Sequence, residues 1–237
     1  MSDDRLIAAL DVPARAVAER LVTQLGDTVS CYKVGMELFY AEGGGTVRWL
    51  KERGKKVFLD LKLHDIPNTV AGGLSSLLHL QPDILNVHTA GGLQMMQTAA
   101  AALRRAAKVR GIPAPKLIGV TVLTSMDDED WRGLGYTGTI TDAVVRRARL
   151  AQEAGLDGVV ASPLETAAIR SACGSDFLIV TPGIRPSGTR HDDQRRVMTP
   201  AEAIRAGASQ IVVGRAIYAE KDPQAAASRI LKEMEGI

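Results

Sequence analysis

The sequence predicts an α/β fold, a (β/α)8 TIM barrel, on three observations. Short runs rich in aliphatic and β-branched residues alternate with longer helical patterns along the whole chain, which is typical of repeated βα units. Eight such runs can be counted, and a helical pattern follows each of them. The length of 237 residues suits one barrel, so we expect a single domain over residues 1–237. An open doubly wound sheet is the alternative architecture.

The expected elements follow one another in regular order. Strands are expected at 6–10, 30–34, 57–62, 84–88, 117–123, 158–161, 178–181 and 210–213. Helices are expected at 14–25, 37–53, 69–80, 93–109, 140–154, 164–172, 200–206 and 223–234. Glycines stand where helical patterns stop before the next strand, at Gly26, Gly54, Gly111, Gly155 and Gly207. The longest irregular stretches, 124–139 and 183–198, each follow a strand, so in a barrel both lie on the ligand-binding face.

Composition excludes several classes of partner. Lys and Arg number 29 against 27 Asp and Glu, a net charge of +2, and the two signs are interspersed without a basic run, which argues against nucleic acid. Cys31 and Cys173 are isolated, without paired or metal-ligand spacing. There is no signal-like N-terminal pattern and no apolar run of the ~18 residues that a membrane helix needs, so we expect a cytoplasmic protein without a membrane partner.

The third expected strand carries charges where a buried strand should be apolar. Asp60 and Lys62 lie two residues apart and therefore project from one face, while Leu59, Leu61 and Leu63 take the other. In a helix-covered barrel the leucines pack outward, and the charged pair points into the mouth at the carboxyl ends of the strands. The alternative is a solvated edge strand with a surface ion pair, but the leucine face is too apolar for an edge.

Other polar residues stand at the expected carboxyl ends of strands. They are Asp11, Lys33, His88, Thr124, Pro182, Gly183, Gly214 and Arg215. A buried strand that breaks at Gly214 and opens a short helix predicts a phosphate site, in which backbone N–H groups and Arg215 face the anion. The alternative, that Gly214 is needed for close packing and that Arg215 is simply solvated, accounts for these two residues equally well. The loop from Thr181 could close over such a phosphate, or it could be an ordinary surface loop.

These residues together resemble the orotidine 5′-phosphate decarboxylase family. The resemblance rests on Leu10-Asp11, Tyr32-Lys33-Val34-Gly35, Asp60-Leu61-Lys62-Leu63-His64-Asp65-Ile66-Pro67-Asn68-Thr69, Asn86-Val87-His88, Val122-Leu123-Thr124-Ser125, Pro182-Gly183-Ile184-Arg185-Pro186, Asp193-Gln194-Arg195-Arg196 and Val213-Gly214-Arg215. It spans essentially the entire chain. The Asp-x-Lys-x-x-Asp motif alone is shared with related sugar-phosphate enzymes, whereas the whole ordered set is specific.

The resemblance implies decarboxylation of orotidine 5′-monophosphate to UMP and CO2 without metal or organic cofactor. Loss of CO2 leaves negative charge on a ring carbon with no obvious electron sink, so stabilised charge and a ready proton are required. By resemblance Lys62 lies beside that carbon and protonates it, and Asp60 lies close to the departing carboxylate. We expect Asp60 to act mainly by holding Lys62, rather than by repelling the carboxylate.

The remaining site residues are assigned by the same resemblance. Lys33 and Asp65 are the outer members of an alternating Lys-Asp-Lys-Asp array, a buried arrangement that is tolerable because every charge has an opposite neighbour. In the family, Asp65 and Thr69 reach into the active site of the partner subunit of a homodimer. The expected substrate contacts are Asp11 for the ribose, Thr124 near the pyrimidine, Gln194 between phosphate and base, and Arg185, Gly214 and Arg215 for the phosphate. His88 is expected to be structural.

Two other functions compete with this interpretation. The first is a related Mg2+-dependent enzyme, such as 3-keto-gulonate-6-phosphate decarboxylase or hexulose-phosphate synthase. Those relatives have a glutamate ligand where this chain has Lys33, a poor ligand for a hard cation. The second is a non-catalytic phosphate-binding barrel, which would be expected to have lost part of the set Lys33, Asp60, Lys62 and Asp65, all four of which are present.

Overall fold

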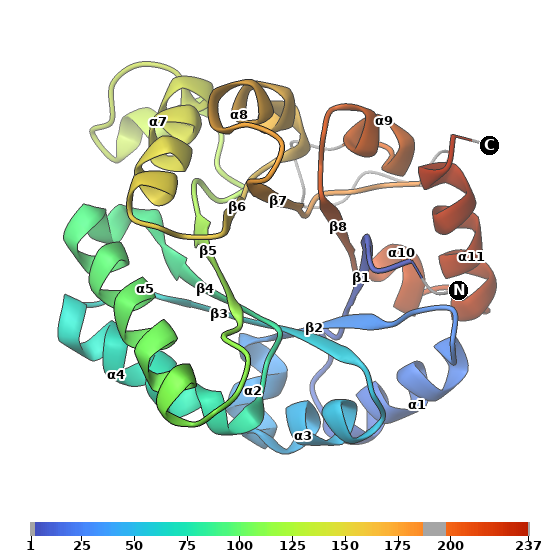
Figure 1. The fold of residues 1–237 in the computed structure, drawn as a ribbon. Helices are drawn as coiled ribbons and strands as arrows, with labels where there is room; N and C mark the ends of the chain where they lie inside the picture. Colours follow the sequence, from blue (N-terminus) through green and yellow to red (C-terminus); the bar gives the residue numbers. More distant parts are fainter. Residues whose placement is uncertain (1–2, 187–197, 237) are drawn as a thin grey trace.

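A closed barrel of parallel strands forms the centre of the molecule (Figure 1). The computed structural model describes residues 3–186 and 198–236. The strands pair in chain order, and β8 pairs with β1 to close the sheet. Their bounds are β1 Leu6–Ala9, β2 Cys31–Gly35, β3 Lys56–Leu63, β4 Ile84–His88, β5 Lys116–Val120, β6 Gly158–Val160, β7 Leu178–Thr181 and β8 Gln210–Val213. The predicted (β/α)8 barrel is confirmed, and the pairing of β8 with β1 excludes an open doubly wound sheet.

Helices surround this barrel on its outside (Figure 1). They are α1 Arg15–Leu25, α2 Met36–Glu42, α3 Gly45–Glu52, α4 Pro67–Leu77, α5 Gly92–Val109, α6 Asp128–Gly133, α7 Ile140–Glu153, α8 Thr166–Cys173, α9 Pro200–Arg205, α10 Arg215–Tyr218 and α11 Pro223–Met234. Short 3-10 turns lie at η1 Leu78–Leu80, η2 Thr89–Gly91 and η3 Pro163–Glu165. Among the described residues, no helix combines the length and the apolar content needed to cross a bilayer.

Three expected segments differ from the prediction. The strand expected at 117–123 ends at Val120. The single helix expected at 37–53 is divided into α2 and α3, because Gly43 takes a φ of 59° and ends α2. The stretch 124–139, expected to be irregular, contains α6. Its amino end is capped by the Asp127 carboxylate, which accepts hydrogen bonds from the N–H groups of Glu129 and Asp130.

Apolar side chains form two layers, as strand alternation requires. One lies inside the barrel and consists of Ile7, Ala9, Cys31, Phe58, Ile84, Ile118, Val180 and Val212. The other lies between strands and helices, where Leu6 and Ala8 of β1 face outward. Because the interior layer is filled by side chains, the barrel is a packed core, and ligands have access only at its mouth.

Strand β3 departs from regular geometry where the charges lie. Leu59 is paired with Leu85 and Leu63 with Val87, so four steps along β3 match two steps along β4. Lys62 has a φ of 52°, the left-handed region that residues other than glycine rarely adopt. The prediction of a regular strand from Asp60 to Leu63 is therefore wrong. Leu61 and Leu63 nevertheless pack against the outer apolar layer, as that prediction expected.

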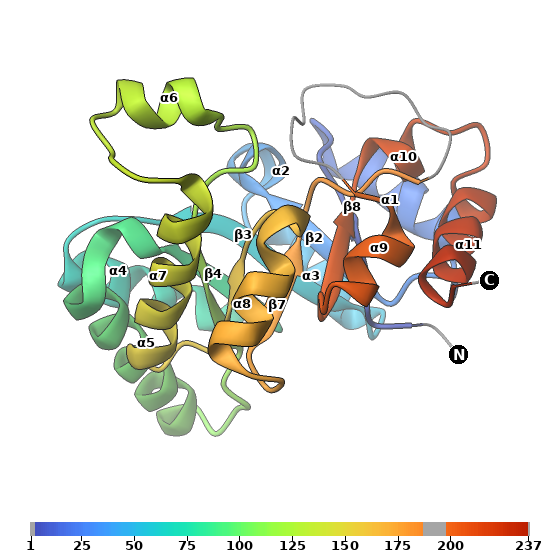
Figure 2. The same ribbon diagram turned by 90° about the horizontal axis from the view of Figure 1, so that it is seen from above.

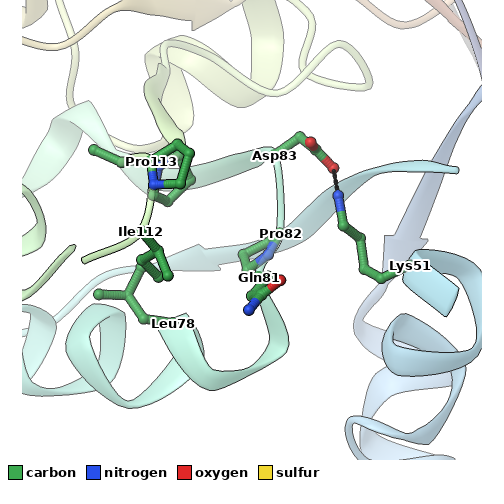
Figure 3. Close-up of a pocket in the computed structure, with 9 residues that line it drawn as sticks. Lys51, Leu78, Gln81, Pro82, Asp83, Ile112 and Pro113 are labelled. Atoms are coloured by element: carbon green, nitrogen blue, oxygen red, sulfur yellow. Dashed lines mark hydrogen bonds and ion pairs between the residues drawn. The ribbon is translucent and has the colours of Figure 1, made fainter. Parts of the chain in front are cut away.

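Aspartate side chains form hydrogen bonds and ion pairs at the amino ends of the strands. The Asp83 carboxylate accepts hydrogen bonds from the Val57 N–H at 2.7 Å and from Lys51 Nζ at 2.6 Å. A cavity of about 210 Å3 lies beside this pair, and its walls include Leu78, Pro82 and Pro113 (Figure 3). It lies at the amino ends of β4 and β5, away from the mouth that carries the predicted site.

Candidate active site

A cavity of about 220 Å3 opens at the carboxyl ends of the strands. Figure 2 shows α6 and α10 on this side of the barrel. The residues that line it are Asp11, Lys33, Phe58, Asp60, Lys62, Val120, Val122, Leu123, Thr124, Val160, Pro182 and Val212. The barrel thus brings together five predicted site residues, from β2, β3 and the segments after β1 and β5, and surrounds their charges with apolar walls.

The charged side chains form a continuous array. Lys33 Nζ lies 2.6 Å from Asp11 Oδ1 and 3.5 Å from Asp60 Oδ2. Lys62 Nζ lies 2.7 Å from Asp60 Oδ1. The order is therefore Asp11, Lys33, Asp60, Lys62. Lys33 and Asp60 are buried, whereas the Lys62 side chain is 28% exposed.

Asp60 is held as a carboxylate within this array. Burial opposes its ionisation, but the ammonium groups of Lys33 and Lys62 and hydrogen bonds from Lys62 and Asn86 prevail and lower the pKa of Asp60. The Asn86 amide donates to Asp60 Oδ1 at 2.6 Å. A buried charge with this many partners is stable in one geometry, which suits it to hold the neighbouring lysine in place.

The predicted phosphate residues lie at the end of β8 and after β7. Gly214 precedes α10, and a Cβ at this position would lie 3.8 Å from Asp11 Oδ2, which places the turn beside the array. Arg215 is the first residue of α10 and is exposed. Arg185 is half-buried and its Nη1 donates to the Ile184 carbonyl at 3.0 Å, rather than lining the cavity. Gln194 lies outside the described residues.

Asp65 and Thr69 do not join the array of their own chain. Both are exposed, on the loop after β3 and in the first turn of α4. Asp65 Oδ1 accepts a hydrogen bond from the N–H of Ile66 at 2.6 Å, and its carboxylate forms no ion pair with any described residue. The outer acidic position of the array within one chain is taken by Asp11 instead.

His88 lies at the end of β4, next to His64, with their ring centroids 5.5 Å apart. Its Nδ1 is buried and has no hydrogen-bond partner among the described residues. Burial, followed by the positive fields of His64, Arg147 and Lys62, lowers the pKa of His88 to about 4. The ring is therefore neutral near pH 7, and a structural role for His88 stays a prediction.

The segment that carries Thr124 is anchored from α7. Arg147 Nη1 donates to the Thr121 carbonyl at 2.6 Å, and its guanidinium lies 5.4 Å from the ring centroids of both Trp131 and Tyr136. Those two rings are stacked at 4.1 Å. Arg147 thus connects α6 to the end of β5 through cation–π contacts and one hydrogen bond.

Two residues of the site had no predicted role. Asn86 is fully buried in β4 and contacts both Asp60 and Lys62; a polar residue inside an otherwise apolar strand was the available signal. Gly35 leaves room for the array, because a Cβ there would lie 3.0 Å from Asp11 Oδ1 and 3.1 Å from Lys33 Nζ. Nothing in the sequence alone indicates that contact.

The barrel and its mouth define a class of protein: a (β/α)8 enzyme with a buried array of alternating charges beside an apolar cavity. Within the described ranges, no group of three or more His, Cys, Asp or Glu side chains is arranged to hold a metal ion. The family model described as "Orotidine 5′-phosphate decarboxylase / HUMPS family" matches residues 4–230. The chain belongs to this family.

Named relatives and a solved structure agree with the family model. The chain is 56% identical over 233 residues to an orotidine 5′-phosphate decarboxylase of Moorella thermoacetica, covering 98% of this chain and 92% of that protein. It is 49% identical over 234 residues to that of Carboxydothermus hydrogenoformans, covering 99% and 97%. A crystal structure of orotidine 5′-phosphate decarboxylase from Lactobacillus acidophilus matches with a TM-score of 0.84 and 40% identity, covering 98% of this chain and 99% of the other.

Proposed function

We propose that the protein decarboxylates orotidine 5′-monophosphate to UMP and CO2, the last step of de novo pyrimidine nucleotide synthesis. The observation that carries this proposal is the Asp11–Lys33–Asp60–Lys62 array, whose members all line one largely apolar cavity. Relatives with identities of 49% and 56% over nearly the whole chain bear the name of this activity. The proposed enzyme is a carboxy-lyase that uses neither a metal nor an organic cofactor.

In the proposed reaction the bond between C6 of the pyrimidine and its carboxylate breaks, and CO2 leaves. The electron pair remains on C6, and a proton from Lys62 Nζ then forms the C6–H bond. Because the ammonium is already positioned by Asp60, the developing negative charge meets a cation that needs no reorganisation. Asp60 thereby serves mainly to hold Lys62 and to favour the charge distribution of the transition state, and Lys33 keeps Asp60 paired on its other side.

The remaining contacts are proposed from position and family resemblance. Thr124 and Asp11 both line the cavity, which supports a contact of Thr124 with the pyrimidine ring and of Asp11 with the ribose. Gly214 and Arg215, where β8 gives way to α10, are proposed to bind the phosphate, together with Arg185 and Gln194. Such remote contacts would supply binding energy that is used at the reacting carbon.

The Mg2+-dependent sugar-phosphate enzymes are the alternative function to be weighed against this proposal. Lys33 Nζ lies between the carboxylates of Asp11 and Asp60, so the chain itself supplies the cation between those two acids. A divalent ion there would have to displace a paired ammonium, and lysine offers it no oxygen ligand. This favours the metal-independent reaction.

We also propose a homodimer with shared active sites, to which Asp65 and Thr69 contribute from the partner subunit. Asp65 is exposed and forms no ion pair within the described part of its own chain. Exposed apolar residues, Met36, Ile66 and Leu123, follow strands β2, β3 and β5 on the same side as the cavity, which suits burial against another subunit. A cytoplasmic location stays a prediction.

The experiment that tests this function is a continuous assay of orotate-ring absorbance with orotidine 5′-monophosphate, with and without EDTA. We expect conversion to UMP at an unchanged rate in EDTA. A requirement for Mg2+ with a sugar-phosphate substrate would identify the related enzymes instead. Binding of phosphate compounds without any turnover would indicate a non-catalytic barrel.

A further inference from the structure

Asn86 is a polar residue at the centre of an apolar strand. It lies in β4 between Leu85 and Val87, and its side chain is completely buried. Both ends of its amide are used across the neighbouring strand: Oδ1 accepts a hydrogen bond from the Lys62 N–H at 2.7 Å, and Nδ2 donates to Asp60 Oδ1 at 2.6 Å. The chemistry of these partners fixes the orientation of the amide, because a flipped amide would place its oxygen against the carboxylate.

The position of Asn86 coincides with the irregularity in β3. Residues 60–62 of β3 lie opposite Asn86 alone, since the flanking pairs are Leu59 with Leu85 and Leu63 with Val87. In this bulge the Lys62 N–H donates to the Asn86 side chain rather than to a strand carbonyl. The left-handed backbone of Lys62 is unfavourable for a residue with a side chain, and such conformations persist where the surroundings determine them.

The same amide also controls the charge next to Lys62. Asp60 Oδ1 accepts from both Asn86 Nδ2 and Lys62 Nζ, while Oδ2 faces Lys33. Asn86 therefore fixes two things at once: the backbone that aims the Lys62 side chain, and the oxygen to which its ammonium is bound.

We propose that Asn86 is a positioning residue for the decarboxylation, holding Lys62 at the reacting carbon through the β3 bulge and the Asp60 carboxylate. This rests on the proposed function, in which Lys62 is the proton donor. Asn86 itself does not line the cavity and acts only through Asp60 and Lys62, which do. A loss of Asn86 should therefore affect the chemical step more strongly than nucleotide binding.

The first test replaces the amide by an apolar side chain of similar size, Asn86→Leu. We expect kcat to fall about 10- to 100-fold, while the affinity for UMP changes less than about threefold, since the phosphate site is untouched. The acid limb of the kcat pH profile should move to higher pH, because Asp60 loses a donor to its charged form. Thr89→Val is the matched control: it removes the buried hydrogen bond from the Thr89 hydroxyl, just after β4, to the Val120 carbonyl at the end of β5, and should leave kcat and the pH profile unchanged.

A second variant, Asn86→Asp, gives a readout that a merely structural residue would not produce. It keeps an acceptor for the Lys62 N–H but can donate to Asp60 only while the two carboxyl groups retain a shared proton. Its activity relative to the original enzyme should therefore fall as the pH rises. If Asn86→Leu does not fold, this pH dependence carries the test.

Three outcomes would overturn the proposal. One is a folded Asn86→Leu enzyme with kcat within threefold of the original and an unmoved pH profile. Another is an activity ratio for Asn86→Asp that does not change with pH. The third is a crystal structure of Asn86→Leu in which the Lys62 backbone and the Lys62–Asp60 distance are unchanged. Absence of turnover in the original enzyme would overturn the proposed function instead. The crystal structure tests the positioning role independently of any activity assay.

Discussion

Lys62 and Lys56 belong to the same strand, but they lie at opposite ends of it. Lys56 is at the amino end of β3 and pairs with Asp4, whereas Lys62 pairs with Asp60 at the mouth of the cavity. Both form an ion pair with an aspartate. This contrast separates the general effect of removing a lysine from the specific loss of the proposed proton donor.

We predict that Lys62→Ala lowers kcat by at least about a thousandfold while UMP still binds, because Lys62 serves the reacting carbon and the phosphate site is remote from it. Turnover and UMP affinity should be measured on the same folded preparation. Lys56→Ala is the matched control and should retain turnover. The assignment of Lys62 is wrong if Lys62→Ala keeps more than about a hundredth of the original activity.

His88 predicts a pH dependence of folding stability. Its pKa is lowered to about 4, so between that value and the ordinary 6.5 the unfolded chain binds a proton that the folded chain does not. The contribution of His88 to the free energy of unfolding should therefore be fully present above pH 6.5. It should decline as the pH falls toward 4, by about 1–2 kcal/mol after allowance for partial exposure of the ring. Asp60 has a lowered pKa and contributes stability that is lost at lower pH, below its usual value of 3.8.

The measurement is urea unfolding across this pH range for the original chain and for His88→Gln. The variant should show a flatter profile between pH 4 and 6.5. His79→Gln, which changes an exposed histidine of η1, should leave the profile as it was. An identical slope in the original chain and in His88→Gln would contradict the assigned cause.

At the scale of elements, the contact between β6 and β7 requires a glycine. A Cβ on Gly158 would lie 2.3 Å from the Leu178 carbonyl oxygen and 2.4 Å from the Leu178 Cβ, closer than any packing allows. The two residues are paired in the barrel, so neither strand can move without disturbing the sheet. The glycine is needed for close approach, not for an unusual φ.

We predict that Gly158→Ala destabilises the fold by about 2 kcal/mol or more, because the backbone must shift to accommodate the new atom. Gly72→Ala in α4 is the matched control. Nothing lies within 4 Å of its new Cβ, and alanine should stabilise the helix by about 0.5–1 kcal/mol. Denaturant unfolding of both variants decides the matter, and a Gly158→Ala chain as stable as the original would refute the packing argument.

The junction of β8 and α10 is the element proposed to bind phosphate. We predict that Arg215→Ala lowers kcat/KM for the nucleotide about tenfold to a hundredfold, as expected for loss of a hydrogen bond to a charged group. Any slow turnover of the phosphate-free nucleoside should hardly change. Arg229→Ala, which removes an exposed arginine of α11 paired with Glu220, should leave both rates unchanged. Equal proportional losses on both substrates would argue against a phosphate role for Arg215.

At the scale of the whole molecule, the proposed shared site makes a prediction about subunit mixing. Asp65 follows Lys62 by three residues, yet its carboxylate does not join the Lys62 array of its own chain. If Asp65 completes the partner's site, mixing Lys62→Ala with Asp65→Ala places both lesions in one site of each mixed dimer and leaves the other intact. With random pairing and independent sites, activity should recover to about a quarter of the original.

Subunit exchange must be demonstrated separately, for example by mass spectrometry of differently tagged chains. If Asp65 completes the site of its own chain instead, each site of a mixed dimer carries one lesion and no activity returns. Proven exchange without recovery would therefore reject the shared site while leaving the decarboxylase assignment intact.

The sequence alone predicted the barrel, its eight strands and five of the twelve residues that line the cavity at its mouth. This was possible because the relevant signals are local: strands and helices differ in period, glycines end helices, and strand ends follow directly from strand positions. Charged residues such as Asp60 and Lys62 in an apolar strand marked the site for the same reason. A single domain over the full length and the role of Gln194, outside the described residues, stay predictions.

Only the tertiary structure decided how those residues meet. The contacts of Lys33 with Asp11 and of Asn86 with Lys62 and Asp60 join residues that are 22 or more positions apart in the sequence. The space that Gly35 leaves matters only because Lys33 and Asp11 meet there. The β3 bulge likewise depends on the register of β3 against β4, which the sequence of β3 alone does not specify. Contacts of this kind arise when the barrel closes, so the positions of charges can be predicted from local pattern, whereas their distances and partners require the folded molecule.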